Sequence, residues 1–341
     1  MLAPHLIRAR LCISLLALGV HCECAAKDPW PSGGFRWLAS GPLVSPAQRD
    51  SDPCHAIKDP TVVFHGGKWH VFATIRSQKR THQIEYLNFA DWASADKAER
   101  HVLTISDGYF CAPQVFYFTP HKKWYLLFQT SDKTRKPELQ PAFSTNESLA
   151  DPAGWSKPVL LFDKEPKIDR WIDFWIICDK TKAHLFFTSL DGKMWRSDTP
   201  LANFPRGWKQ PEVALEGDIF EASHTYKLKG RDEYLTIIEA QGPGGIRYYK
   251  AYTADQLDGK WQALAASLDK SFALASKTKF RGDMWTTSIS HGELLRSGSD
   301  ERLEVDPARL KFLFQGVSDQ ARAGKGYGKI PWRLGVLELA P

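Results

Sequence analysis

The sequence predicts an all-β protein, a five-bladed β-propeller built as a single domain. Three observations support this prediction. Short runs rich in β-branched and aromatic residues alternate with turn residues along most of the 341-residue chain, which is the pattern of antiparallel hairpins. The hairpin unit recurs five times, at a spacing of roughly 50 to 70 residues. No amphipathic stretch between the units is long enough to predict more than a short helix.

The five units follow one another along the chain. They span residues 56–75, 111–131, 171–198, 220–254 and 288–316. The first, second and fifth are expected to be two-stranded hairpins, whereas the third and fourth carry a third strand. A β-sandwich and a β-helix are the alternatives, but such a sandwich would be unusually large and a β-helix requires a shorter, stricter repeat. Because no linker divides the chain, we expect one propeller domain over residues 27–341.

Residues 1–26 have the layout of a secretory signal peptide. Arg8 and Arg10 precede an apolar run over residues 11–20, and small residues end the segment at Ala26. The run is too short to span a bilayer comfortably. We therefore expect a secreted protein, extracellular or periplasmic, without a membrane partner. A lipoprotein signal or an uncleaved anchor is the alternative.

Composition narrows the class of function. The net charge of +6 comes from Lys and Arg residues that are scattered rather than blocked, which argues against a nucleic-acid partner. The many aromatic residues suit a β-rich protein and, where exposed, could stack on sugar rings. Cys54, Cys111 and Cys178 are too widely spaced for a Cys-x-x-Cys metal site. One disulfide with a spare thiol and three reduced cysteines both stay open.

Asp173 interrupts the apolar run WIDFWIICD, residues 171–179. An ionised carboxylate in such a setting is unfavourable unless it is paired, hydrogen-bonded or used in chemistry. In a regular strand it would share a face with Trp171 and Trp175, with Phe174 on the other face. Considered alone, it is equally well explained as a structural hydrogen-bonding group.

Two more carboxylates head other units. In a propeller the first strand of each blade lines the central axis, so the residues that begin these strands gather at one face. Asp59 heads the first unit, Asp173 the third and Glu221 the fourth, whereas Gln114 and His291 head the second and fifth. Singly, Asp59 could be a turn residue before proline and Glu221 an edge residue. Together they predict a shared pocket.

Glycoside hydrolases use a set of carboxyl groups as their catalytic groups. One carboxylic acid protonates the leaving oxygen, and one carboxylate activates water or attacks the sugar carbon. A third carboxylate nearby raises the pKa of the acid by repulsion between like charges.

Several motifs carry a resemblance to a known family. In order they are IKDPTVVFHGGKWHVFA, APQVFYF, WIDFWIICD, DIFEASHTYKLKG, ISHGELLRS, LKFLFQG and PWRLGVL. From FRWLASGPLVSP (35–46) to Leu339, the chain resembles glycoside hydrolase family 62, whose members are α-L-arabinofuranosidases acting on arabinoxylan. It is similar, more distantly, to family 43, which shares the five-bladed propeller and the Asp, Asp, Glu set.

The resemblance implies roles for individual residues. Asp59 would be the general base, Glu221 the general acid and Asp173 the group that tunes the acid and holds the substrate. The family inverts the anomeric centre, which requires acid and base about 6.5–9.5 Å apart. Substrate-binding candidates are Lys58, Gln114, Trp285, Tyr327 and Arg333.

His291 matches a family histidine that can ligate calcium. Ca²⁺ prefers several oxygen ligands, so waters would complete the shell, and a structural histidine is the alternative. Tyr327 lies in the glycine-rich GKGYGKIPWR and could equally be a surface tyrosine. We expect no cofactor for the chemistry itself, and a monomer whose partner is arabinoxylan or an arabinoxylo-oligosaccharide.

The chain also departs from the family pattern. Residues 76–89 (RSQKRTHQIEYLNF) are more basic than expected, Phe110 and Cys111 stand near the pocket, and Cys54 and His55 lie close to the expected base. These departures affect substrate preference more than reaction class.

Three alternatives remain. A β-xylosidase or arabinanase similar to family 43 would use the same three carboxylates. A sugar-binding propeller without activity would repeat one binding motif in every blade, whereas these blade heads all differ. A purely structural scaffold would explain none of the carboxylates.

Overall fold

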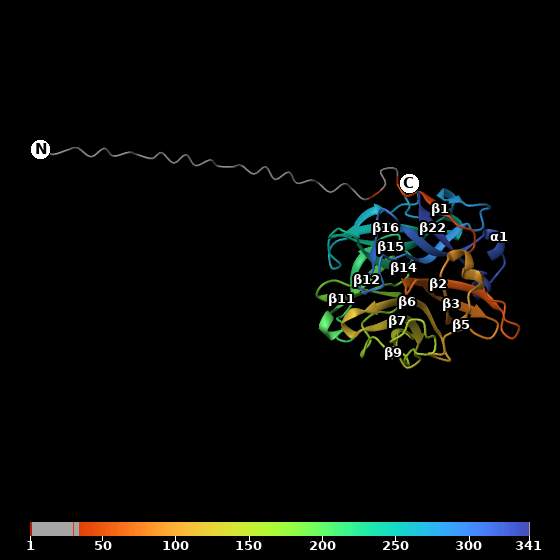
Figure 1. The fold of residues 1–341 in the computed structure, drawn as a ribbon, viewed down its shortest axis with the longest axis horizontal. Helices are drawn as coiled ribbons and strands as arrows, with labels where there is room; N and C mark the ends of the chain where they lie inside the picture. Colours follow the sequence, from red (N-terminus) through yellow and green to blue (C-terminus); the bar gives the residue numbers. More distant parts are fainter. Residues whose placement is uncertain (2–29, 31–33, 341) are drawn as a thin grey trace.

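The computed structural model describes Met1, Trp30 and residues 34–340. The predicted signal peptide therefore lies outside the described residues, apart from Met1. The described chain folds into five β-sheets that follow one another around a ring, coloured in sequence order in Figure 1. The predicted five-bladed propeller is confirmed. None of the described helices is long and apolar enough to cross a membrane.

The first three blades are four-stranded sheets built from consecutive strands. Blade I contains β2 (Cys54–His65), β3 (Lys68–Ser77), β4 (Gln83–Phe89) and β5 (His101–Val102). Blade II contains β6 (Phe110–Phe118), β7 (Lys123–Ser131), β8 (Leu139–Asn146) and β9 (Val159–Leu160). Blade III contains β10 (Ile172–Cys178), β11 (Lys182–Thr188), β12 (Lys193–Pro200) and β13 (Glu212–Glu216).

The last two blades have five strands each, and each includes a strand from another part of the chain. Blade IV contains β14 (Glu221–Leu228), β15 (Tyr234–Gln241), β16 (Arg247–Ala254) and β17 (Gln262–Ala265), with β20 (Glu304–Val305) beside β14. Blade V contains β19 (Ser288–Leu294), β21 (Lys311–Val317), β22 (Arg333–Leu339), β1 (Trp37–Ala39) and β18 (Lys279–Phe280). Each of the five blades therefore contains outer strands that were missing from the predicted units.

Helical segments in the described chain are short and lie in the connections. The 3₁₀ turns are η1 (Trp92–Lys97), η2 (Thr119–His121), η3 (Leu201–Asn203), η4 (Pro243–Gly245), η5 (Ala275–Lys277) and η6 (Tyr327–Lys329). The α-helix α1 (Asp319–Arg322) precedes η6 in the long loop between β21 and β22.

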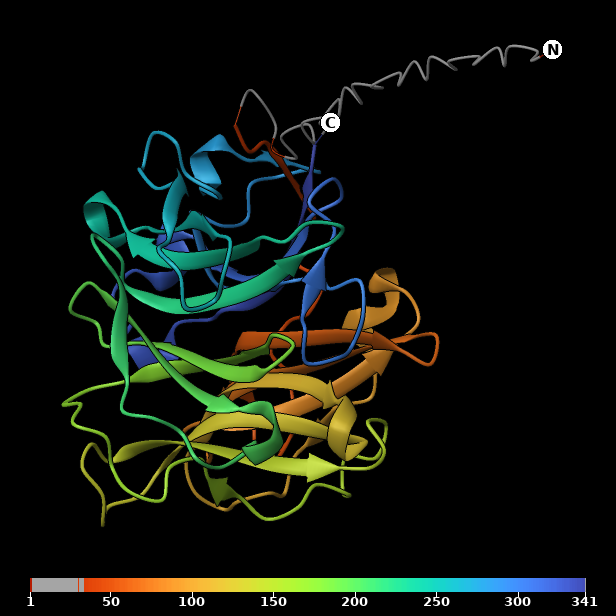
Figure 2. The same cartoon turned by 90° about the vertical axis from the view of Figure 1, so that its left-hand side faces the viewer.

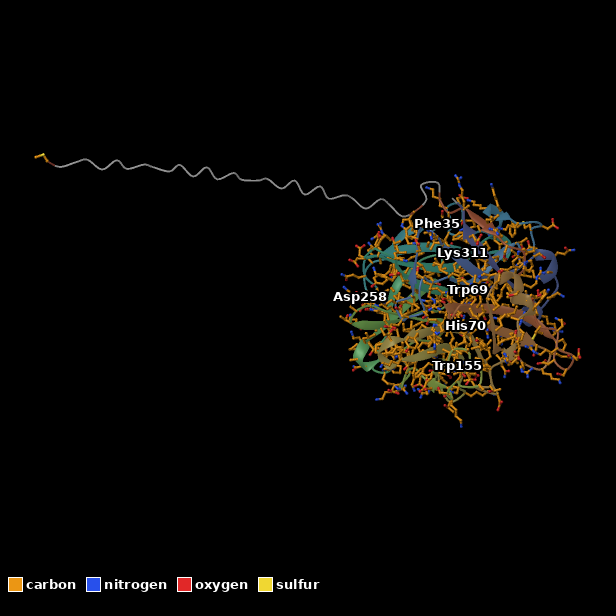
Figure 3. All side chains as sticks on the ribbon, viewed as in Figure 1. Phe35, Trp69, His70, Trp155, Asp258 and Lys311 are labelled. Atoms are coloured by element: carbon orange, nitrogen blue, oxygen red, sulfur yellow. The ribbon has the colours of Figure 1, made fainter. Side chains whose placement is uncertain are left out.

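The ring is closed by the first strand of the chain. β1 pairs antiparallel with β22, and Trp37 lies opposite Leu339. In Figures 1 and 2 this strand lies beside the C-terminal strand. Trp37 and Phe35 pack on Phe272, at ring-centroid distances of 5.2 and 4.7 Å. Figure 3 shows Phe35 and Lys311 at this closing blade and Trp155 at the opposite end of the view.

The innermost strand of every blade contains a β-bulge near its start. The strand register shifts at Lys58/Thr61, Cys111/Gln114, Ile172/Trp175, Glu221/His224 and Ser290/Gly292. In four blades the bulge contains a non-glycine residue with positive φ, namely Asp59, Ala112, Asp173 and Ala222. Bulges redirect side chains and are common beside active sites.

The bulge in β10 also breaks the expected alternation of its apolar side chains. Trp171 and Phe174 both pack on Phe187, whereas Trp175 stacks on His224 of β14 at 4.1 Å. The prediction that Trp171 and Trp175 share a face was therefore wrong. An extra residue at Asp173 shifts the strand, so period-2 reasoning fails across it.

Candidate active site

The bulges bring the three predicted carboxylates together. Asp59 and Asp173 occupy the positive-φ position of blades I and III, and Glu221 immediately precedes that position in blade IV. The Nδ1 atom of His291 lies 3.5 Å from Asp59 Oδ1 and 3.8 Å from Asp173 Oδ2. The backbone N–H of Ala222 donates to Asp173 Oδ2 at 3.1 Å. Residues from four blades thus share one site.

Asp59 is held as an anion. Its carboxylate is buried, and Lys58 Nζ lies 2.9 Å from Oδ2. Burial by itself would raise the pKa of Asp59, but the charges of Lys58 and then His291 lower it to about 2. The Asp59 N–H donates to Gln315 Oε1 at 2.7 Å, which fixes the bulge. At neutral pH this group accepts protons and can serve as a general base.

Glu221 is held as an acid. Its side chain is 17% exposed, and burial raises its pKa well above the usual value, with the charges of Glu239 and Asp173 adding to the effect. Arg247 opposes the shift from 2.9 Å. A carboxyl group that keeps its proton near neutral pH can protonate a leaving group.

The pKa of Asp173 is subject to effects that oppose one another. Burial raises its pKa, and the nearby charge of Asp59 acts in the same direction. His291, Lys58 and the Ala222 amide oppose the shift. Its charge contributes to the raised pKa of Glu221, and the tuning role that the family resemblance implied stays a prediction.

Two functional neighbours were missed by the sequence reasoning. Glu239 is fully buried and accepts hydrogen bonds from Arg247 Nη1 at 2.5 Å and from the His291 N–H at 2.7 Å. Arg247 also contacts Glu221, so it bridges the two glutamates. A signal for Glu239 was present, because it interrupts the apolar run YLTIIEA as Asp173 interrupts its own. The partner of Arg247 depends on strand register, which spacing does not reveal.

Lys58 and Tyr327 form the wall beside the base. Lys58 Nζ lies 3.5 Å from Tyr327 Oη and 5.4 Å from the centre of its ring. Tyr327 is 55% exposed, so its ring stands at the opening of the site. A substrate that reaches Asp59 would pass this ring.

Trp285 and Arg333 form a separate contact on blade V. The Arg333 guanidinium lies 5.3 Å from the Trp285 ring centre, and Trp285 Nε1 donates to the Ser40 carbonyl at 2.8 Å. Within the described residues, neither side chain forms a hydrogen bond or ion pair with the three carboxylates. Their substrate-binding role stays a prediction.

Gln114 lies elsewhere than predicted. The residue of blade II that matches Asp59 and Asp173 is Ala112, and Gln114 follows the bulge. Its fully buried amide accepts from the Ile176 N–H and donates to the Ile176 carbonyl, both at 2.7 Å. Because both polar groups bind the neighbouring blade, we assign Gln114 to blade packing rather than to substrate binding.

Cys111 holds the place in blade II that Lys58 and Glu221 hold in theirs. Its thiol contacts Tyr109 Oη at 3.2 Å and Gln129 Nε2 at 3.4 Å. Burial raises its pKa to about 12, so the thiol stays protonated. Cys54, Cys111 and Cys178 are free and buried, which settles the disulfide question for the described chain.

The described residues around His291 offer few ligands for a metal ion. In the described chain, no group of three or more His, Cys, Asp or Glu side chains is arranged to hold a metal ion. A calcium ion at His291 would need several more oxygen ligands than these residues provide. The calcium site therefore stays a prediction, and no catalytic step below uses it.

Comparison with known proteins gives the family. The model of glycosyl hydrolase family 62 matches residues 36–338. The chain belongs to this family. The predicted family and the predicted class of enzyme, a glycoside hydrolase, are both confirmed. The chain is also 37% identical over 324 residues to α-L-arabinofuranosidase C of Cellvibrio japonicus, covering 93% of this chain and 48% of that protein. It thus spans about half the length of this curated relative.

Solved structures of the family superpose closely on this one. The catalytic domain of the Coprinopsis cinerea family-62 α-L-arabinofuranosidase is 38% identical, with a TM-score of 0.84 over 90% of this chain and 98% of that one. The Podospora anserina α-L-arabinofuranosidase, solved with cellotriose, is 37% identical, with a TM-score of 0.84 over 92% and 99%. A family-43 hydrolase at 14% identity and a TM-score of 0.57 shares the fold.

Proposed function

We propose that the protein is an α-L-arabinofuranosidase that removes arabinofuranose side chains from arabinoxylan with inversion. The observation that carries this proposal is a pair of carboxyl groups in one site whose pKa values are shifted in opposite directions. The pKa of Asp59 is lowered to about 2 and that of Glu221 is raised well above its usual value. This is the division of roles that glycoside hydrolysis requires.

The proposed mechanism uses the side chains as the structure holds them. Glu221 donates its proton to the glycosidic oxygen as the bond to the arabinose carbon breaks. Asp59 removes a proton from the water that attacks the same carbon from the opposite side. Asp173 supports the protonated state of Glu221 until the leaving oxygen takes the proton. The hydrolase is thereby returned to its starting state after the two protons exchange with solvent.

Relatives support a β-linked polysaccharide as the substrate. One solved family-62 hydrolase, 36% identical to this chain, is in complex with xylotriose, and the Podospora anserina enzyme is in complex with cellotriose. For this chain we propose a xylan main chain bound at the opening marked by Tyr327. We also propose that the protein is exported, because residues 1–26 have the layout of a signal peptide.

The decisive experiment is incubation of the enzyme with wheat arabinoxylan, debranched arabinan and unsubstituted xylo-oligosaccharides, with the released sugars separated by anion-exchange chromatography. We expect arabinose from arabinoxylan. Release of xylose alone would contradict the proposal in favour of a β-xylosidase, and release of arabino-oligosaccharides alone in favour of an arabinanase. The first anomer formed, followed by proton NMR, is expected to be the inverted one.

A further inference from the structure

A cavity of about 570 Å³ opens beside Tyr327, between the β3–β4 turn and the loop that joins β21 to β22. Its charged lining residues are Arg76, Lys79, Arg80 and Lys329, with His55 next to them. No Asp or Glu is among the described residues that line it. We refer to it as the cationic cavity. Nothing in the proposed hydrolysis requires this concentration of positive charge.

Most of these charges have no ion-pair partner among the described residues. Asp52 pairs with Arg80 and also accepts from the Lys79 N–H at 2.8 Å and from Ser77 Oγ at 2.9 Å. Asp52 therefore fixes the shape of the turn and neutralises one cation. Over the described part of the chain, the side chains of Arg76, Lys79 and Lys329 form no ion pair. Three cations thus face a common space.

The Arg76 guanidinium lies against Gly328 of the facing loop. A Cβ atom at Gly328 would lie 2.5 Å from Arg76 Nη2, so the guanidinium packs directly against the backbone of this loop. The contact joins the two walls of the cationic cavity. A guanidinium suits planar, two-oxygen anions, because its donors form a planar fork.

The cationic cavity adjoins the catalytic site through Tyr327. Tyr327 lines it and also contacts Lys58, the neighbour of the base. Burial, followed by the charges of Lys58 and Arg76, lowers the pKa of His82 to about 3. Lys58 and Arg76 thus both act on His82, so the positive charge of the cavity lies near the positive charge beside Asp59.

We propose that the cationic cavity binds the carboxylate of a uronic-acid substituent carried by the polysaccharide substrate. The choice of a sugar carboxylate rests on the proposed function, because the ligand that passes Tyr327 is then a polysaccharide. The fork of Arg76 receives the carboxylate, and the lysines of both walls add charge. The enzyme would thereby act on acidic xylan more efficiently than on its neutral counterpart.

The test compares two polymers that differ only in charge. Mobility of the protein is measured in native gels that contain glucuronoxylan, or the same polymer after its carboxyl groups have been reduced to alcohols. We expect the unmodified polymer to retard the wild-type protein more, and the difference to fall with added salt because exposed charges are screened. This measurement needs no catalytic activity, so it stays informative if the proposed function fails.

Substitutions in the cationic cavity test whether the stronger retardation by glucuronoxylan arises there. Lys79→Gln/Lys329→Gln is expected to weaken binding to glucuronoxylan about threefold to fivefold, while turnover of 4-nitrophenyl α-L-arabinofuranoside stays unchanged. The matched control is Lys180→Gln/Lys229→Gln, which removes the same charge at exposed positions at the far ends of β10 and β14. It is expected to keep the wild-type preference.

Three results would overturn the proposal. Equal retardation of the wild-type protein by the two polymers would show that the carboxylate is not recognised. Equal losses in the cavity variant and in the control would show an effect of net charge alone. Displacement by inorganic phosphate at concentrations where glucuronate has no effect would assign the cavity to phosphate instead.

Discussion

The carboxylates of the site differ in charge because of their nearest neighbours. Asp59 has Lys58 at 2.9 Å, whereas the arginine next to Glu221 is shared with Glu239. The sequence predicted the three carboxylates because each stands beside apolar residues near a strand start. It could not predict Arg247 or Glu239, since their effect depends on which strands lie side by side.

Replacing either catalytic group should remove most of the activity. Asp59→Asn and Glu221→Gln are each expected to lower kcat on arabinoxylan by at least about a hundredfold, the usual contribution of one acid–base group. Arabinose release measures the effect, and circular dichroism checks the fold. Glu216→Gln, which changes an exposed glutamate on β13, serves as the control. Wild-type activity in either catalytic variant would remove the corresponding assignment.

Glu239 should set the alkaline limit of activity. Glu221 acts only while protonated, and Glu239 both repels its charge and occupies Arg247. In Glu239→Gln, Arg247 has Glu221 as its only charged partner in the pair. It then stabilises the ionised form of Glu221 more strongly, so the pKa of Glu221 falls. The alkaline limb of the kcat/KM profile should therefore move to lower pH. An unchanged limb with reduced kcat would point to a purely structural role.

Burial of the acid should also lower stability at high pH. Because the folded pKa of Glu221 is raised above 4.5, its contribution to stability is fully present below the unfolded pKa and is lost as pH rises through the folded pKa. Glu221→Gln cannot ionise, so its Tm should exceed that of the wild type at pH 9 and approach it at pH 4. Thermal scans at both pH values test this, and a Tm difference independent of pH would contradict it.

At the scale of elements, the β-bulges determine which side chains each blade directs towards the central axis. Period-2 alternation predicted the inner hairpins, since their apolar runs are long and bounded by turns. It could not predict the bulges, because a bulge is defined against the partner strand. The outer strands β4, β5, β8 and β9 were missed because their apolar patterns are short or weak, and β8 contains Pro141.

Gln114 should stabilise the contact between blades II and III. Gln114→Ala leaves the N–H and the carbonyl of Ile176 buried without their partner, so we expect a loss of about 2–4 kcal/mol in the free energy of unfolding. Denaturation in urea gives the value. Gln262→Ala on the exposed strand β17 is the control. A higher KM with unchanged stability would instead restore the substrate-binding role first expected for Gln114.

At the scale of the whole molecule, a propeller is stable only as a closed ring, since an open ring exposes two blade faces. The closing strand β1 is three residues long and carries the buried Trp37. The domain start expected at residue 27 lies before β1, but the pairing of β1 with the last blade was not predicted, because pairing across the whole chain leaves no local pattern.

Trp37 should therefore matter more than its place near the chain start suggests. Trp37→Ala removes the packing on Phe272 and the hydrogen bond to its carbonyl, and we expect a loss of about 3–5 kcal/mol. The control, Val213→Ala, truncates an exposed residue on β13. Unfolding monitored by tryptophan fluorescence and by circular dichroism should give coincident curves for both proteins. A loss below about 1 kcal/mol in Trp37→Ala would show that β1 does not hold the ring together.

The same pairing leaves the two ends of the described chain side by side, with the Ala340 N–H donating to the Arg36 carbonyl at 2.8 Å. A short glycine-rich linker could join them, and new ends could be opened at the Gly66–Gly67 turn, at the far end of β2 from Asp59. Such a circular permutant would keep every bulge and every blade contact described above. Partner domains fused to its new ends would then extend from the face opposite the carboxylates, leaving the approach of a polysaccharide clear.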